Sequence, residues 1–327
     1  MADVGKTGTE WGAAQALQFL PEVVVLRPRL VERIWGVMEL PAFLEQPQPA
    51  HPIGEAWLTA LECEVEDAPG LTLGDIVRRW PEAFGAEGRA QFPLLMKLLF
   101  PREKLSVQVH PNDEEAKAIG ESCGKTECWY ILEAEPGAEV AVGFREPIAP
   151  DDMKRAIAEG TLESKLRYLQ VKAGDMVYVD AGTIHGIGPG MVVLETQQYS
   201  DVTYRLYDYG RPRELHLDAG LAVTKAQTEA GLVMPEPHDG FVRLVRSPYF
   251  AVDRFDVVPG TASPLGVVDG VQILVALEEG AAIGLGAGRS TALPAGRAVL
   301  LLGRARATYA LRAERPCNVI RVTEGRM

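Results

Sequence analysis

The sequence is poor in histidine and cysteine and holds no long apolar run. Its four cysteines, Cys63, Cys123, Cys128 and Cys317, are scattered and fit neither a small disulfide scaffold nor a zinc knuckle. We therefore expect free thiols in a reducing cytosol. No stretch approaches the roughly 18 to 20 apolar residues of a membrane span, and the first ten residues contain no apolar signal region. These absences predict a cytoplasmic protein without a membrane partner.

An excess of positive charge is also missing. The formal net charge is −12, so the release of counterions that drives nucleic-acid binding is not available, and we expect no nucleic-acid partner. A few local cations can nevertheless outweigh a diffuse negative field. A small phosphate-bearing ligand is therefore compatible with the composition.

Long helical patterns are rare along the chain. The 33 glycines and 23 prolines are spread throughout and cut the sequence into short apolar segments, which is typical of a barrel or jelly roll. One of the expected strands covers Ala56–Glu64. Only three stretches favour helix: Leu73–Trp80 after Thr72, Asp113–Ile119 after a cap at Asn112 or Asp113, and Asp151–Glu159. The fold class predicted is therefore mainly β with a few short helices.

Two of the five histidines lie in unusual sequence settings. His110 ends the segment 105–110, where strand alternation places Gln108 and His110 on one face and Val107 and Val109 on the other. An amide oxygen and an imidazole on one face make half of a metal site. The alternative is an edge strand with two solvated residues.

His185 follows a glycine turn. The spacing of Gly174, Gly182 and His185 matches the second cupin motif, G-x5-P-x-G-x2-H, with Asp180 in the proline position. In cupins this turn directs a histidine into the barrel. The spacing therefore indicates a second metal-ligating imidazole.

Glu127 and Lys125 share a face if their segment is a strand. A carboxylate and a lysine on one wall can serve a metal and an anionic substrate together, although a surface ion pair is the simpler alternative. Gln108, His110, Glu127 and His185 together offer two nitrogens and two oxygens. This set suits zinc, and it also admits iron, manganese or cobalt.

The segment 194–209 alternates polar and charged side chains with aromatic ones. So many hydrogen-bonding groups in one strand indicate the wall of a polar cavity. Arg205 in this wall is a candidate partner for a phosphate or a developing oxyanion. The alternative is a structural ion pair with Asp201 or Asp208.

Taken in order, several segments resemble the signatures of type I mannose-6-phosphate isomerases: VQVHPND, GKTECWY, GDMVYVDAGTIHGIG and QQYSDVTYRLYDYGR. Further matches are Glu32–Gly36, Gly54–Trp57 and 92–99. The resemblance covers about residues 22 to 215 and continues weakly toward the C-terminus. It implies that Gln108, His110, Glu127 and His185 bind one metal ion per chain, Zn²⁺ first among the divalent metals. It further implies catalytic or substrate-binding roles for four residues: Lys97, Lys125, Glu195 and Arg205.

The resemblance also implies a division of the chain into two cupin-type jelly-roll barrels. We expect an N-terminal extension at 1–20, where a short amphipathic helix fits, and a catalytic cupin with helical insertions at 21–225. A linker at 226–239, which holds two prolines and few strand formers, leads to a second, degenerate cupin at 240–327. No histidine follows His238, so the second cupin should not hold metal through histidine.

The expected reaction interconverts mannose 6-phosphate and fructose 6-phosphate through a cis-enediol, in a monomer or homodimer. Catalytic roles are expected for Arg205, Lys125 and Glu195, and substrate binding for Lys97, Lys125 and Arg205. The proton carrier is open between a metal-held water, Glu195 and Lys125. Two other functions fit a cupin, a non-catalytic sugar-phosphate binder and an iron dioxygenase. The ligand cluster disfavours the first, and the phosphate-binding cations disfavour the second.

Overall fold

The computed structural model describes residues 21–45, 47–84, 91–266, 270–286, 288–302 and 309–325. The predicted N-terminal extension lies outside these residues. The described chain is mainly β, which confirms the predicted fold class. None of the described helices is long and apolar enough to cross a membrane.

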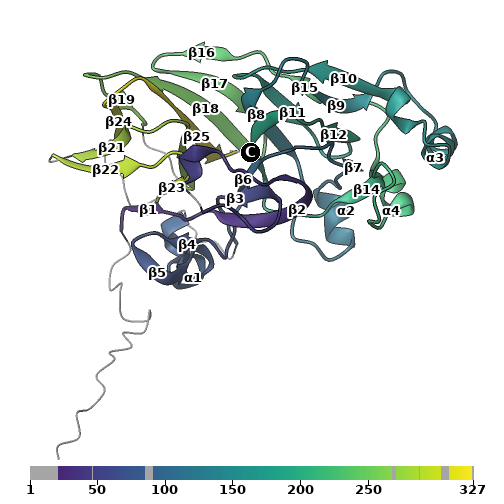
Figure 1. Ribbon diagram of the computed structural model, residues 1–327. Coiled ribbons are helices and arrows are strands. Elements are labelled where there is room, and N and C mark those ends of the chain that lie inside the picture. Colours follow the sequence, from purple (N-terminus) through teal and green to yellow (C-terminus); the bar gives the residue numbers. More distant parts are fainter. Residues whose placement is uncertain are drawn as a thin grey trace, which may run out of the picture.

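Two sheets form the half of the molecule at the right of Figure 1. The first large sheet has the strand order β15 (Gly231–Leu232), β11 (Met176–Val179), β8 (Glu127–Ala134), β13 (Met191–Gln198), β6 (Leu94–Leu99), β3 (Ile53–Trp57) and β2 (Arg29–Val37). The first small sheet has the order β10 (Leu166–Gln170), β9 (Glu139–Phe144), β12 (His185–Ile187), β7 (Val107–Val109) and β14 (Tyr204–Tyr207).

Two further sheets form the other half. The second large sheet has the order β1 (Val23–Val25), β23 (Ala298–Leu301), β20 (Gln272–Ala276), β25 (Cys317–Glu324), β18 (Phe250–Val257), β17 (Phe241–Arg246) and β16 (Glu236–His238). The second small sheet has the order β19 (Ser263–Pro264), β24 (Ala310–Ala313), β21 (Ala281–Gly286) and β22 (Arg289–Leu293). A hairpin of β4 (Glu64–Val65) and β5 (Ala68–Thr72) forms a separate two-stranded sheet, and Val65 and Leu71 of this hairpin belong to the buried cluster between the large sheets.

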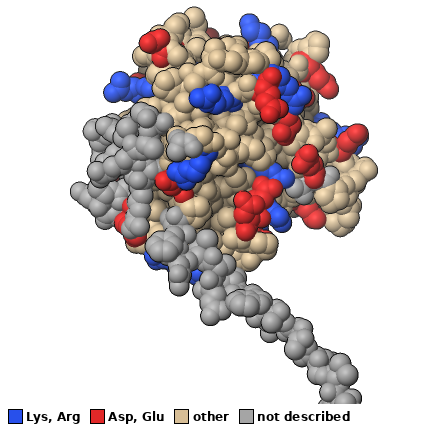
Figure 2. Space-filling view, turned by 90° about the vertical axis from the view of Figure 1, so that its left-hand side faces the viewer, with Lys and Arg blue, Asp and Glu red and all other residues tan. Residues whose placement is uncertain are grey.

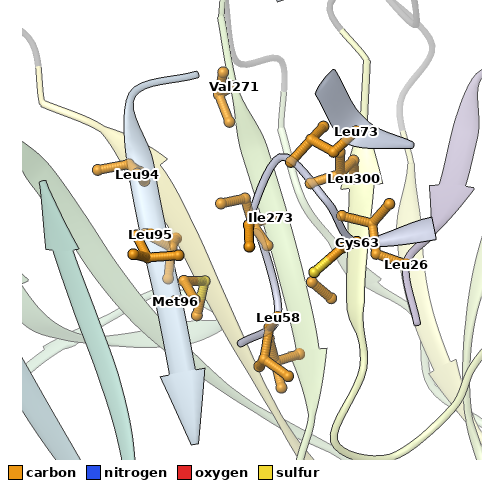
Figure 3. Packing of buried hydrophobic residues seen from close by; sticks show 14 of the residues in the cluster. Leu26, Leu58, Cys63, Leu73, Leu94, Leu95, Met96, Val271, Ile273 and Leu300 are labelled. Carbon is orange, nitrogen blue, oxygen red and sulfur yellow. The ribbon is translucent and has the colours of Figure 1, made fainter. Parts of the chain in front are cut away.

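The four sheets stack in layers because each large sheet is apolar on both faces. Met96 of β6 and Ile273 of β20 belong to one buried cluster between the two large sheets (Figure 3). The opposite face of the first large sheet packs Trp129 and Val193 against Val140 and Val142 of the first small sheet. The opposite face of the second large sheet is likewise covered by the second small sheet. Successive residues of one strand therefore face different layers, as the strand period of two requires.

The described strand pairings do not join either large sheet to its small sheet. The sheets thus form two facing pairs, which agrees with a cupin-type fold but does not confirm two closed barrels. The proposed linker carries β15, which pairs with the first large sheet, and β16, which pairs with the second. The division of the chain into domains stays a prediction.

The three predicted helices are present: α1 (Leu73–Arg79), α2 (Asp113–Ala118) and α3 (Pro150–Ala158). Thr72 caps α1, and Asn112 rather than Asp113 caps α2, each in a reciprocal capping box. Within its described residues, the structure adds α4 (Leu217–Val223) and three 3-10 turns at Ala42–Leu44, Pro81–Phe84 and Leu162–Lys165. The predicted strand Ala56–Glu64 is wrong beyond Trp57, where β3 ends.

Candidate metal centre and its cavity

Three buried side chains converge between the first large and first small sheets. Glu127 opens β8 in one sheet, His185 opens β12 in the other, and His110 follows β7. Their ligand atoms all lie within 4.8 Å of one another. Nε2 of His110 lies 3.6 Å from Glu127 Oε2, and Nε2 of His185 lies 3.4 Å from Glu127 Oε1. Facing sheets thus bring together residues that are up to 75 positions apart, 185 minus 110.

A backbone carbonyl oxygen lies beside Nδ1 of each imidazole. Nδ1 of His110 lies 2.7 Å from the Val202 carbonyl oxygen, and Nδ1 of His185 lies 2.9 Å from that of Thr183. When Nδ1 donates to these carbonyls, the Nε2 lone pair of each ring faces Glu127. Burial lowers the pKa of His110 well below its usual value and that of His185 to about 4. Both rings are therefore neutral near pH 7, the form that binds a metal.

Glu127 supplies the negative charge of this cluster. Its Oε1 accepts a hydrogen bond of 3.1 Å from the Trp129 indole. Its buried Oε2 lies 2.7 Å from Lys125 Nζ, so the two side chains form a buried ion pair. A buried carboxylate beside two imidazole lone pairs fits a divalent cation.

Gln108 lies beside the three as predicted, because strand alternation turns it inward while Val107 and Val109 face the outer cluster. Its Nε2 is 3.3 Å from His185 Nε2, and its Oε1 accepts from the Ser106 hydroxyl. Rotating the amide by half a turn would direct Oε1 toward the cluster and leave Nε2 beside a hydroxyl that also accepts. Gln108 can therefore serve as the fourth ligand in that orientation.

Two lysines and a glutamate form the wall next to the metal cluster. Lys125 Nζ lies 3.1 Å from His110 Nε2 and 3.7 Å from Glu195 Oε1. Lys97 faces Glu195 across the β6–β13 ladder, and their charged groups are 4.0 Å apart. The interpretation of Lys125 and Glu127 as a surface ion pair is wrong, since their side chains are 4% and 1% exposed.

Burial and neighbouring charges shift the pKa values of Glu195 and Lys125 in this wall. Burial raises the pKa of Glu195 to about 7, and the two lysines only partly oppose it. Burial alone would lower the pKa of Lys125, but Glu127 and Glu195 raise it above its usual value. Lys125 therefore stays a cation, whereas the Glu195 carboxyl group can gain or lose a proton near neutral pH.

Asp201 is a further member of the wall. It pairs with Lys97 at 2.6 Å, and Lys97 also lies 4.6 Å over the Trp57 ring. Burial would raise the pKa of Asp201, but Lys97 and Lys125 hold it below the usual value. Asp201 was considered from sequence only as a partner of Arg205. Its place three residues after the end of β13, inside the dense polar segment, was the signal for a site residue.

A cavity of about 520 Å³ opens from this wall, and its lining includes Lys97, Gln108, Lys125, Glu195 and three arginines, Arg33, Arg205 and Arg213. The side chains of Arg33 and Arg213 are 31% and 23% exposed, whereas that of Lys97 is 4% exposed. The arginines thus mark the solvent side of the cavity and the lysines its depth.

Arg205 makes no ion pair with any described residue. Its Nη1 donates to the Glu214 carbonyl at 2.8 Å, while its buried Nε lacks a partner in the described chain. The alternative ion pairs are taken, because Asp201 binds Lys97 and Asp208 binds Arg211 and Arg213. Burial and the charges of Arg213, Arg211 and Arg33 lower the pKa of Arg205. Cations that lie close together despite burial and mutual repulsion favour an anionic ligand.

Sequence reasoning missed Arg33 and Arg213 as cavity residues. Arg33 lies within the quoted match Glu32–Gly36, but no role followed from it. The guanidinium is held by Glu55, at 2.8 Å from Nε to Oε1. Arg213 follows the quoted segment by two residues and is fixed by Asp208. The facing of the two sheets places Arg33 beside Arg205, and the loop that follows β14 places Arg213 there.

Comparisons with known proteins agree on one family. Residues 23–142 match the model of the phosphomannose isomerase type I catalytic domain. Mannose-6-phosphate isomerase ManA of Bacillus subtilis is 37% identical over 260 residues, 74% of this chain and 81% of that protein. A crystal structure of a mannose 6-phosphate isomerase from Bacillus subtilis is 30% identical with a TM-score of 0.83, over 92% of this chain and 99% of that one. A zinc-bound mannose 6-phosphate isomerase structure has a TM-score of 0.74 at 16% identity, over 93% and 100%, and shows the same fold.

Proposed function

The chain belongs to the type I mannose-6-phosphate isomerase family, and from that premise we propose that it interconverts mannose 6-phosphate and fructose 6-phosphate with one metal ion. The observation that carries the proposal is that His110, Glu127 and His185 meet directly beside Gln108 and Lys125, two residues that line a cavity together with three arginines. Such a cavity offers a Lewis acid to one end of a sugar phosphate and cations to the other.

The metal would be held by Gln108, His110, Glu127 and His185, and zinc is the ion we propose. Two imidazole nitrogens and a carboxylate are common zinc ligands, and a relative of the same fold is zinc-bound. When bound, the ion supplies positive charge to the sugar oxygens at C1 and C2.

Lysines of the chain would stabilise the reacting end of the sugar, and arginines would bind its phosphate. Lys97 and Lys125 would both stabilise negative charge on an enediolate, and Lys125 stays a cation because its acidic neighbours raise its pKa. Arg205, with Arg33 and Arg213 nearby, would bind the phosphate through unused N–H groups.

Proton transfer between C1 and C2 needs a group that both accepts and donates near neutral pH. The raised pKa of Glu195, about 7, supports it as that carrier over Lys125, which its acidic neighbours keep protonated. The intermediate that fits this arrangement is a cis-enediol, because one carboxyl group serves both carbons from one side of the sugar.

A coupled assay that reports fructose 6-phosphate tests the proposal. Purified protein should turn over mannose 6-phosphate, lose the activity with a chelator and regain it with zinc. Unphosphorylated mannose is the matched control and should react far more slowly, since it leaves the arginines unused. Absence of turnover with zinc supplied would overturn the proposal and favour a sugar-phosphate binder.

The proposal also covers location and assembly. We expect a cytoplasmic enzyme that is a monomer or homodimer. Light scattering of the purified protein measures the second point, and a larger assembly would contradict it.

A further inference from the structure

The strand that carries Arg205 is the outermost strand of the first small sheet. β14 pairs with β7 on one side, and no other described strand pairs with it. At its outer edge, the backbone groups of Arg205 bond to His216 instead. The Arg205 N–H donates to His216 Nδ1 at 3.1 Å, and the His216 N–H donates to the Arg205 carbonyl at 2.7 Å. One imidazole thus takes the place that a neighbouring strand would fill.

The same short segment also holds the far end of Arg205. The Glu214 carbonyl accepts from Nη1 at 2.8 Å, so residues 214–216 contact both the backbone and the guanidinium of one arginine. The contacts to this segment leave Nε and Nη2 for another partner. The geometry therefore fixes the direction of the side chain and leaves donors for an anion.

His216 uses its side chain for this contact rather than for the helix that follows. It occupies the N-cap position of α4 and makes no side-chain capping bond. An N-cap side chain that bonds to the first turn typically stabilises a helix by about 1 kcal/mol. The imidazole instead turns back to β14, where only a ring with a free Nδ1 lone pair can accept the Arg205 N–H.

The helix that follows His216, α4, packs closely against β14. Gly220 of α4 is buried, and a Cβ at this position would lie 2.6 Å from Leu206 Cδ2 and 3.2 Å from Tyr204 Cβ. Leu206 and Tyr204 flank Arg205 on β14. Because this close approach allows little sliding, α4 provides a fixed base for the imidazole.

We propose that His216 is a positioning residue of the active site, whose imidazole holds the backbone of Arg205 so that the guanidinium meets the substrate phosphate. In its activity measurements this inference rests on the proposed function. The competing interpretation is that His216 only stabilises the start of α4. The two differ in whether the effect of a substitution passes through Arg205.

His216→Phe removes the acceptor and keeps a ring of similar shape. We expect about a tenfold fall in kcat/KM, the size expected for one lost hydrogen bond to a positioned group. The fall should appear in the same parameter, KM or kcat, that Arg205→Lys changes. Metal content should stay at the wild-type value. His51→Ala, at an exposed histidine, is the matched control and should leave kcat/KM unchanged.

A double-mutant cycle decides between the two interpretations. In an Arg205→Ala background, His216→Phe should cause little further loss, since its effect passes through the missing guanidinium. A full tenfold loss in that background, or no loss in the wild-type background, would overturn the inference. If His216→Phe is not recovered as folded protein, His216→Ala replaces it in the same cycle. A wild-type protein without isomerase activity would instead refute the proposed function.

Discussion

The two pairs of sheets differ in what lies between them. Between the first large and first small sheets, buried residues include two imidazoles, two lysines and two glutamates: His110, His185, Lys97, Lys125, Glu127 and Glu195. Between the second pair lies a cluster of apolar side chains that includes Leu274, Val299 and Leu311. Similar layers can thus enclose either a polar cavity or a dry core, and the difference comes from the side chains on the inner faces.

The second pair contains a buried ion cluster in which arginines bind both carboxylate oxygens of Asp253. Asp253 lies opposite Arg321 on neighbouring strands, and Arg321 Nη2 is 2.6 Å from Asp253 Oδ2. Arg243 binds the other carboxylate oxygen. The Asp253 carboxylate is therefore surrounded by arginine donors, whereas Glu127 also lies beside the Nε2 atoms of two buried imidazoles. A buried carboxylate beside imidazole lone pairs fits a metal ion, and one held between guanidinium groups fits a structural role.

The molecular surface supports the same distinction. On the face of the second small sheet, Lys and Arg are interspersed with Asp and Glu (Figure 2). In the first pair, the cavity draws Arg33, Arg205 and Arg213 together. Three arginines therefore lie close together at the candidate site, among acidic residues that pair with two of them.

The largest effect is expected from Glu127→Gln. The substitution removes the carboxylate of the metal cluster, so the loss of metal affinity should exceed the roughly 100-fold typical for changes outside the ligand shell. Gln108→Ala should cost less, since an amide contributes only a dipole. Elemental analysis and kcat/KM of both variants measure this. A greater loss of metal in Gln108→Ala would reverse the ranking.

Arg205→Lys comes next in size. It keeps the charge but loses the planar fork, and we expect roughly a hundredfold fall in kcat/KM. Metal content and melting temperature should remain close to wild type. A rise in KM would indicate phosphate binding, and a fall in kcat would indicate a role in the transition state. A fully active variant, or one that is merely unstable, would return Arg205 to a structural role.

The metal-free protein should lose stability in acid because of the buried imidazoles. The pKa of His185 is about 4 when folded, against about 6.5 when unfolded, so the unfolded chain binds the extra proton between these values. The free energy of unfolding should therefore fall by on the order of 3 kcal/mol as the pH drops from 6.5 to 4.

Glu195 acts in the opposite direction, since its folded pKa of about 7 lies above the unfolded value. Its contribution favours the folded state at low pH and is lost as the pH rises from about 4.5 to 7. Metal-free Glu195→Gln should consequently show a steeper rise of stability with pH than metal-free wild type. Denaturant titrations at several pH values give the slopes, and equal slopes would show that burial does not shift these groups.

The smallest effect on activity is expected from Asp253→Asn, the counterpart of Glu127→Gln in the second pair. It leaves two arginines partly unpaired, so the free energy of unfolding should fall by about 3 kcal/mol or more. Metal content and kcat/KM per folded molecule should not change. A loss of metal in this variant would show that the two pairs of sheets are not independent in function.

The sequence predicted the strands and turns that carry the ligands, because alternation and glycine spacing are local signals. The inward side chains of Gln108 and His110 followed from the period of two, and α2 followed from its cap at Asn112. β16 was missed because its segment is poor in strand formers and holds proline, although it pairs with the neighbouring β17. The ends of β3 and the strand β15 were missed because their pairing depends on distant partners. Arg33 was missed for the same reason, since only tertiary structure brings β2 to the cavity.

Histidine 216 illustrates what local patterns leave out. Its sequence setting contains no motif, and its contact with Arg205 spans 11 positions and uses the edge of a sheet. Strand pairing and side-chain direction had to be known together before this contact could be recognised.

Titration of the metal-free protein with zinc tests the central claim most directly. Turnover of mannose 6-phosphate should be absent at the start, rise with added zinc and level off at one ion per chain. His185→Ala should bind less metal and show no such plateau. Full activity of the metal-free protein, or undiminished metal in His185→Ala, would contradict the assignment of this cluster as the metal centre.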